Sequence, residues 1–273
     1  MSVTIADSPA LQVKPDAAAT PAAASRLRIV FVGHVDHGKS TLIGRIFYDT
    51  HSLPEGKVEQ IQAACKAEGM EFEYAFLLDA LLEEQAQNIT IDTTQIQFRT
   101  AKRPYVIIDA PGHKEFLKNM ISGAASADAA ILLIAANEGV REQSRRHGYL
   151  LSLLGIRQVV VAVNKMDLVG WDRTRFEEIV SEYRAFADRI GIHHLQAIPL
   201  SALLGDNVIE KSAAMPWYEG PTLLTHLETV TVASEEADKP FRFPVQWINR
   251  PNSDFLGYAG TVAGGRIRPG DEV

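Results

Sequence analysis

Nine residues near the start of the chain, GHVDHGKST at 33–41, place two glycines, a lysine and two hydroxyls directly after the apolar run LRIVFV. The pattern G-x-x-x-x-G-K-[ST] binds phosphate groups when a strand precedes it and a helix follows it. Gly33 and Gly38 let backbone N–H groups approach phosphate oxygens, because no Cβ stands in the way. Lys39 can reach the β- and γ-phosphates. Taken alone, a tight strand-to-helix turn without a ligand is the alternative interpretation. The residues predicted to contact the nucleotide here are Gly33, His34, Val35, Asp36, His37, Gly38, Lys39, Ser40 and Thr41.

A second polar stretch, DAPGHKE at 109–115, ends the apolar run YVII. An aspartate at the carboxyl end of a parallel strand lies where such sheets bind their ligands. Asp109 can hold Mg²⁺ through a water molecule, the Ser40 hydroxyl can ligate the same ion, and the Gly112 N–H can approach the γ-phosphate. In isolation, an Asp-Pro-Gly type of turn that caps a helix explains this stretch equally well.

The stretch VAVNKMDLV at 161–169 places Asn164, Lys165 and Asp167 at the end of another apolar run. The Asp167 carboxylate can accept two hydrogen bonds from guanine, from N1–H and from the 2-amino group. Adenine lacks this pair of donors, so its binding would leave a buried charge unpaired. Lys165 can lie along the base, and Asn164 can hold the loop to its neighbours. A chance surface turn is the alternative for this motif alone.

Two further stretches complete the pattern. In PLSALLG at 199–205, the backbone amides of Ser201 and Ala202 can contact guanine O6. In ITID at 89–92, Thr90 can close over Mg²⁺ and the γ-phosphate, so that the preceding segment senses GTP. A strand-forming threonine without a ligand is the alternative for Thr90. In this order along the chain, the stretches predict a GTPase domain.

Composition excludes several other classes of protein. The net charge of −7 argues against broad electrostatic binding to nucleic acid or to an anionic membrane. Cys65 is the single cysteine, which fits a reducing cytoplasm. The apolar stretch AAILLIAA at 129–136 is far shorter than the roughly 20 residues of a membrane-spanning helix. Residues 1–25 lack a basic start and an apolar centre, so we expect a disordered tail and not a signal peptide.

The alternation of apolar runs and amphipathic stretches predicts an α/β fold with a doubly wound, mostly parallel sheet. Helices are predicted at 39–48, 113–125, 141–154 and 175–190, and the segment 49–89 is a long insertion of helical character. In the segment 90–98, apolar and polar residues alternate, as they do in an edge strand with one exposed face. The other strands are expected at 27–32, 105–109, 129–136, 158–163 and 196–200.

The composition changes after Leu227, which predicts a domain boundary. We expect a GTP-binding domain at 26–230, a polar linker at 231–240, and the start of a β-barrel domain at 241–273. The last segment alternates like short strands joined by Gly and Asn turns. It is too short for a closed barrel, so the chain is predicted to stop inside its second domain.

With these motifs in view, residues 27–273 resemble the translation-factor class of GTPases, whose signatures are GHVDHGKST, ITID, DAPGH and NKMD. The resemblance implies that His113 is the catalytic residue that orients the attacking water. It also implies that Val35 and Ile89 form an apolar gate in front of His113. The implied cofactors are GTP and Mg²⁺, with Ser40, Thr90 and Asp109 around the metal.

Three stretches, at 141–169, 215–224 and 249–260, narrow the resemblance to the GTP-binding large subunit of bacterial ATP sulfurylase, sulfate adenylyltransferase. That family includes the nodulation-type bifunctional form, which is fused to an adenylylsulfate kinase. The resemblance implies that GTP hydrolysis is coupled to forming adenylylsulfate and pyrophosphate from ATP and sulfate. A small partner subunit would carry out the adenylyl transfer, with no nucleic acid or membrane partner.

Two residues depart from the family pattern. Asn88 stands where glycine is common before Ile-Thr-Ile, and Gln85 stands where a basic residue is frequent. Asn tolerates a left-handed backbone better than most residues, so Asn88 can preserve the turn. The alternatives that remain open are a translation elongation factor, a piece of the bifunctional form without its kinase domain, and a fragment that binds GTP without coupling it to another reaction.

Overall fold

The computed structural model describes residues 26–88, 95–109, 127–230, 240–250, 252, 255–268 and 270–272. The chain divides into two compact units, one at Ala23–Val230 and the other comprising Met1–Ala22 with Thr231–Val273. The two units are considered separately. The predicted helix at 113–125 lies outside the described residues.

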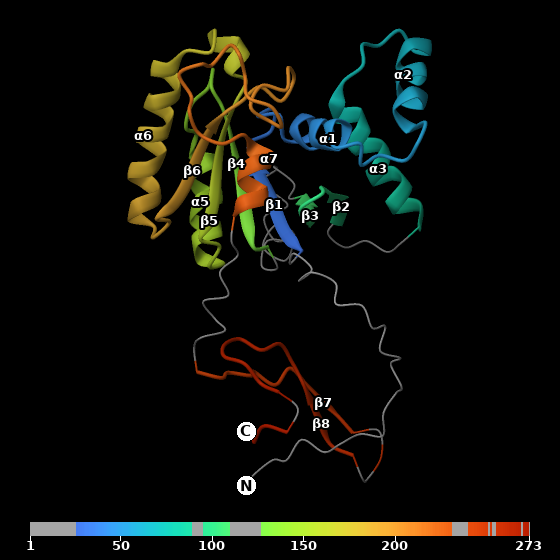
Figure 1. The fold of residues 1–273 in the computed structure, drawn as a ribbon, viewed down its shortest axis with the longest axis vertical. Coiled ribbons are helices and arrows are strands. Elements are labelled where there is room, and N and C mark those ends of the chain that lie inside the picture. The colour runs from blue at the N-terminus through green and yellow to red at the C-terminus, as the bar shows by residue number, and fades with distance from the viewer. Residues whose placement is uncertain are drawn as a thin grey trace. The chain divides into compact units, whose positions relative to one another are not determined.

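The larger unit contains a six-stranded sheet in the order β2-β3-β1-β4-β5-β6 (Figure 1). All neighbouring strands run parallel except β2, which is antiparallel to β3. The doubly wound, mostly parallel sheet predicted from the sequence is therefore confirmed. The strands are β1 Leu27–Gly33, β2 Gln95–Arg99, β3 Pro104–Asp109, β4 Ala129–Ala135, β5 Gln158–Asn164 and β6 His194–Pro199.

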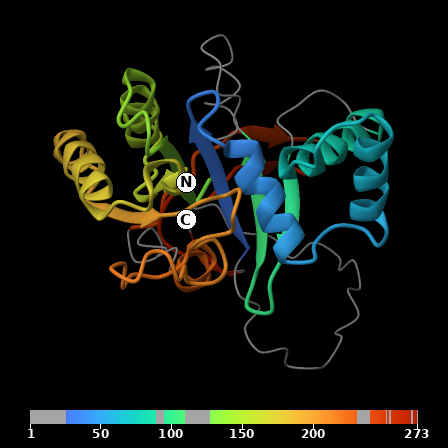
Figure 2. The ribbon, with the colours of Figure 1, turned by 90° about the horizontal axis from the view of Figure 1, so that it is seen from above.

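Helices cover both faces of the sheet. One face packs against α1 Lys39–Asp49, α3 Tyr74–Asn88 and α7 Leu223–Thr229, and the other against α5 Glu142–Leu153 and α6 Arg173–Arg189. Alternate residues of β1 enter the two cores, Ile29 and Phe31 the first and Val30 and Val32 the second. Figure 2 shows α5 and α6 side by side and apart from α1 and α3. Each fully buried aliphatic side chain contributes about 1.5–3 kcal/mol, so these two cores hold the sheet in place.

The helix α6 illustrates how the sequence determines an element. Apolar residues recur in it at steps of three and four positions, and Phe176, Ile179, Tyr183 and Ala187 are buried. Asp172 caps its N-terminus, because the carboxylate accepts hydrogen bonds from the backbone N–H groups of Thr174 and Arg175.

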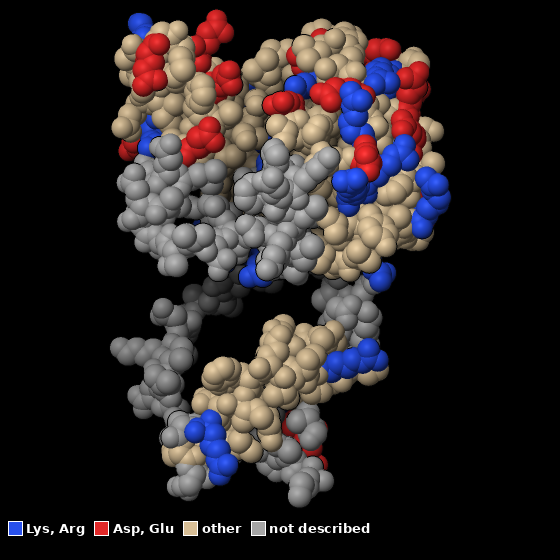
Figure 3. All heavy atoms as spheres, turned by 180° about the vertical axis from the view of Figure 1, so that it is seen from behind, with Lys and Arg blue, Asp and Glu red and all other residues tan. Residues whose placement is uncertain are grey.

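Basic and acidic side chains alternate on the outer surface of α5 and α6. Arg145 pairs with Glu182 at 2.6 Å and Arg173 with Glu177 at 2.7 Å. Figure 3 shows charges of both signs interspersed on the larger unit. Exposed pairs of this kind contribute about 0–1 kcal/mol each, so they favour solubility more than stability.

The long insertion between α1 and β2 is helical, as predicted. It contains α2 Lys57–Ala67 and α3. At the start of α3, the Tyr74 ring lies against the Tyr48 ring. The Arg45 guanidinium lies 4.8 Å from the centre of the Tyr74 ring. Cys65 is buried in α2. No helix among the described residues is both long and apolar enough to cross a membrane.

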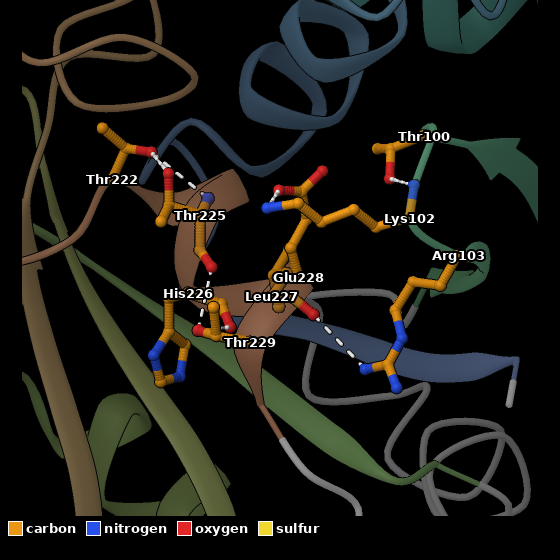
Figure 4. Close-up of polar contacts among 9 residues, drawn as sticks. All are labelled: Thr100, Lys102, Arg103, Thr222, Thr225, His226, Leu227, Glu228 and Thr229. Atoms are coloured by element: carbon orange, nitrogen blue, oxygen red, sulfur yellow. Dashed lines mark hydrogen bonds and ion pairs between the residues drawn. The ribbon is translucent and has the colours of Figure 1, made fainter. Parts of the chain in front are cut away.

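The turn between β2 and β3 is attached to α7, the last helix of the unit (Figure 4). Arg103 Nη1 donates to the carbonyl oxygen of Val230 at 2.9 Å and approaches that of Leu227 at 3.5 Å. Lys102 Nζ lies 2.7 Å from Glu228 Oε2. The turn therefore supplies cations to the C-terminal end of α7, where the helix dipole favours positive charge.

The smaller unit contains a two-stranded antiparallel sheet of β7 Trp247–Asn249 and β8 Gly257–Ala259. A further bridge joins Arg242 and Gly264. Several large apolar side chains of this unit are exposed, and Trp247 is 69% exposed. That it begins a β-barrel domain remains a prediction.

Candidate nucleotide-binding site

The first motif lies in the strand–turn–helix context that phosphate binding requires. The strand β1 ends at Gly33, α1 begins at Lys39, and residues 33–38 form the turn, which we call the phosphate loop. Ser40 and Thr41 are half-buried at the start of α1, whereas Val35 is 45% exposed. The N-terminal end of α1 thus follows the loop directly, and the N-terminal end of a helix is a favourable place for an anion.

Gly38 is required by both its backbone and its neighbours. Its φ of 85° lies in the left-handed region, and a Cβ there would collide with the side-chain amide of Asn164. Gly33 is restricted too, because a Cβ would lie 3.1 Å from that of Leu133 on β4. The phosphate loop is thus packed against β4 and β5 without room for larger residues.

Asn164 joins three of the predicted stretches. Its Nδ2 donates to the carbonyl oxygen of His37 at 2.9 Å, and its Oδ1 accepts from the Ala202 N–H at 2.9 Å. The side chain is buried, 2% exposed, so both bonds are protected from water. One amide therefore fixes the phosphate loop, the end of β5 and the loop after β6 relative to one another.

Asp167 lies half-buried in a short 3-10 helix, η2 Met166–Val169, directly after β5. Lys165, directly before this short helix, has a left-handed backbone conformation with a φ of 61°. The Met166 N–H donates to the carbonyl oxygen of Leu200 at 3.3 Å, which places the Asp167 loop beside Ser201 and Ala202. The residues predicted to bind the base thus lie together at the carboxyl ends of β5 and β6.

The amides of Ser201 and Ala202 already have acceptors within the protein. The Ser201 N–H donates to the carbonyl oxygen of Asp206 at 3.2 Å, and the Ala202 N–H to Asn164 Oδ1. Contact with guanine O6 therefore requires one of these amides to share its proton between two acceptors. Their role as donors to the base remains a prediction.

Several predicted residues lie outside the described part of the chain, namely Thr90, Gly112, His113 and the gate residue Ile89. Asp109 ends β3 in register with Phe31 of β1, and only its backbone is described. Among the residues that the structure describes, no group of three His, Cys, Asp or Glu could hold a metal. A Mg²⁺ site built from hydroxyl, carboxylate and nucleotide oxygens needs no such group, because Mg²⁺ binds one or two protein oxygens together with phosphates.

Two buried histidines, His37 of the phosphate loop and His147 of α5, lie near one another, and the sequence prediction missed the second. His37 Nδ1 lies 3.1 Å from the carbonyl oxygen of Leu133, its ring meets the His34 ring edge-on at 5.3 Å, and burial lowers its pKa. His147 of α5 is 3% exposed. Burial, followed by the nearby charges of Lys39 and the two loop histidines, lowers the pKa of His147 to about 4. Burial therefore favours the neutral form of both His37 and His147.

The sequence did contain a signal for His147. The buried positions of α5 are Ser144, His147, Gly148 and Leu151, which follow the helical repeat. A histidine on the apolar stripe of a predicted helix is a buried polar group that needs a physical reason.

A cavity of about 1030 Å³ lies elsewhere in the larger unit, between the end of α1 and the loop after β6. Arg45, Asp49 and Glu210 are among its lining residues. None of the predicted nucleotide-binding residues that the structure describes lines this cavity, so it is separate from the described part of the candidate site.

Comparison with known proteins identifies the larger unit. Residues 24–233 match the elongation factor Tu GTP binding domain. The chain is 49% identical over 252 residues to the bifunctional enzyme NodQ of Rhizobium sp. (strain N33), covering 91% of this chain and 39% of NodQ. It is 50% identical over 250 residues to sulfate adenylyltransferase subunit 1 of Bacteroides fragilis (strain YCH46), covering 90% of this chain and 52% of that protein.

Among solved structures, sup35 complexed with GDP is 28% identical, with a TM-score of 0.56, over 88% of this chain and 53% of that one. These findings confirm the resemblance to the sulfate adenylyltransferase large subunit and its bifunctional form. The chain spans about half the length of such relatives, or less.

Proposed function

We propose that this chain, which belongs to the elongation factor Tu GTP binding domain family, is the Mg²⁺-dependent GTPase part of a cytoplasmic sulfate adenylyltransferase. In this proposal GTP hydrolysis is coupled to the formation of adenylylsulfate and pyrophosphate from ATP and sulfate. A small catalytic subunit, in complex with the longer protein, performs the adenylyl transfer.

The observation that carries the nucleotide part is the pair of hydrogen bonds made by Asn164. They hold the phosphate loop and the two base-side loops together at one edge of the sheet. Ligands of doubly wound sheets bind at this edge, beyond the carboxyl ends of the strands. The site can therefore hold phosphates at Lys39 and a purine at Asp167 simultaneously.

Each predicted site residue has a role in this proposal. The loop amides and Lys39 neutralise the phosphate charge, and the Asp167 carboxylate accepts from guanine N1–H and the 2-amino group. Ser40, Asp109 and Thr90 would hold Mg²⁺, which neutralises charge that develops on the phosphate oxygens when it is bound. His113 orients the attacking water, and Val35 and Ile89 together control the access of His113 to that water.

The sulfate adenylyltransferase part rests on relatedness. Two kinds of relative, sulfate adenylyltransferase subunit 1 and NodQ, are matched almost equally well, at 50% and 49% identity. The words "subunit 1" in the relative's name support a partner subunit for the longer protein. Because the identities to subunit 1 and to NodQ are so similar, they favour neither the single-function form nor the bifunctional one.

The experiment uses the longer parent protein together with the small sulfurylase subunit. Pyrophosphate release from ATP and sulfate is followed with and without GTP, in the wild type and in Asp167→Asn. We expect strong GTP dependence that the substitution abolishes. If GTP has no effect while ribosomes accelerate its hydrolysis, the chain acts as a translation factor instead.

A further inference from the structure

A side-chain contact outside the predicted site joins the two loops that face the base. Trp171 Nε1 donates to Asp206 Oδ2 at 2.9 Å, and both side chains are half-buried. Trp171 ends the loop that carries Asp167, and Asp206 lies in the loop that begins with Ser201 and Ala202. The bond therefore connects segments that would read opposite parts of the guanine edge.

Trp171 is held in an unusual backbone conformation. Its φ is 54°, a left-handed value that is an outlier for a bulky residue. Its N–H donates to the carbonyl oxygen of Met166 at 2.8 Å, and its own carbonyl oxygen accepts from Trp217 Nε1 at 3.1 Å. Such conformations cost about 1–3 kcal/mol and persist only where the surroundings fix them, often at functional sites.

Asp206 is fixed just as firmly from its own side. Oδ1 accepts from the Ser212 hydroxyl at 2.6 Å, and its backbone carbonyl oxygen accepts from the Ser201 N–H at 3.2 Å. Hydrogen bonds accepted by a carboxylate are of the stronger, charge-assisted kind. The position of Asp206 therefore sets the position of Ser201 and of Ala202 beside it.

We infer that Trp171 and Asp206 form a clamp that fixes the spacing between Asp167 and the Ser201–Ala202 segment and so sets selectivity for guanine. Both are positioning residues that do not touch the base. The two loops are already joined near their N-terminal ends by the hydrogen bond between Met166 and Leu200. The clamp joins them again nearer their C-terminal ends. This inference rests on the proposed guanine-nucleotide binding.

The test compares GDP with inosine diphosphate, which lacks only the 2-amino group. Trp171→Phe keeps an aromatic ring but removes the indole donor, and Asp206→Ala removes the acceptor. We expect each to raise the GDP dissociation constant about three- to tenfold, the worth of one hydrogen bond. The preference for GDP over inosine diphosphate should fall too, because the 2-amino group contributes less when Asp167 is not held in place.

Two variants separate positioning from general stability. Asp206→Asn leaves an amide oxygen that can still accept from the indole, so it should restore most of the preference. Tyr218→Phe removes a hydroxyl that donates to the carbonyl oxygens of Ala197 and Pro221 in a neighbouring segment, so it should lower stability and leave the preference unchanged. Competition against fluorescent GDP on the 273-residue chain gives all the constants.

An unchanged preference in Trp171→Phe and Asp206→Ala, with wild-type GDP binding intact, overturns the clamp alone. Absence of GDP binding in the wild type overturns the proposed nucleotide function, and the clamp with it. A loss of preference in Tyr218→Phe equal to that in Trp171→Phe also overturns the clamp, because any destabilisation would then suffice.

Discussion

The side-chain amide of Asn164 donates to the carbonyl oxygen of His37 at 2.9 Å across 127 positions of sequence. The same side chain accepts from Ala202, so it contacts both the phosphate side and the base side of the candidate site. A purine nucleotide spans these two sides. The geometry of the site therefore depends on Asn164 even if its amide never touches the ligand.

Replacing Asn164 with Ala should reduce both stability and nucleotide affinity. The substitution leaves the His37 carbonyl and the Ala202 N–H without partners, at about 1–3 kcal/mol for each buried group. Urea unfolding and GDP titration measure the two effects. Asn207 is the matched control, because it is equally buried and also makes two 2.9 Å bonds, to Pro199 and from Ser212. Asn207→Ala should lower stability similarly, with a smaller effect on GDP; equal losses of affinity would contradict the special place of Asn164.

Gly38→Ala should abolish GDP binding, whereas Gly56→Ala should not. Both glycines precede a helix with positive φ, 85° and 78°, so alanine is strained at either position by about 1–2 kcal/mol. They differ in surroundings, because a Cβ at Gly38 collides with Asn164, whereas one at Gly56 meets no atom of the described residues within 4 Å. Calorimetric GDP titration of the two variants separates backbone strain from displacement of Asn164. Equal affinities would show that the contact is unimportant.

Much of this arrangement follows from local sequence patterns, and some does not. The near-continuous apolar runs of β4 and β5 predict buried parallel strands, and the motifs after β1, β5 and β6 predict which loops face the ligand. The bond between Trp171 and Asp206 has no such signal, since it depends on how two irregular loops fold 35 positions apart. Likewise, the occupied amide of Ala202 depends on the orientation of one side chain, Asn164, which no periodicity encodes.

His113→Ala should retain GTP binding and lose most GTP hydrolysis. In the proposed mechanism His113 orients the attacking water and makes no contact that holds the nucleotide, and such a group contributes about 10²–10⁴-fold to the rate. Single-turnover hydrolysis and equilibrium binding on the same preparation separate the two effects. Turnover equal to the wild type would remove His113 from the catalytic role.

Acidification should destabilise the larger unit through His147. The folded-state pKa is about 4 and the ordinary value is 6.5, so the unfolded chain takes up the proton first. Stability from this group is complete above about pH 7 and is lost as the pH falls from 6.5 towards 4. At pH 5.5 the free energy of unfolding should therefore be about 1.4 kcal/mol lower than at neutral pH.

Urea unfolding at pH 7.5 and 5.5 measures this loss, and His147→Gln should reduce the difference between the two conditions. His193 is 70% exposed in the turn between α6 and β6 and serves as the control, since His193→Gln should leave the pH dependence as it is in the wild type. A wild-type pH dependence in His147→Gln would assign the effect to other groups.

Arg103→Ala should destabilise the larger unit more than Lys102→Ala does, although the two cations are neighbours in one turn. Arg103 bonds to the carbonyl oxygen of Val230 at the end of α7, a half-buried contact to a group that otherwise lacks a helical partner. Its loss should cost about 1–3 kcal/mol. Lys102 is 60% exposed, and its pair with Glu228 should contribute less than about 1 kcal/mol.

Unfolding by urea at low and high salt distinguishes the two contributions, because salt should weaken the Lys102 contribution and leave most of that of Arg103. If the two variants are equally stable, the turn holds α7 by general packing and not through the Arg103 hydrogen bond.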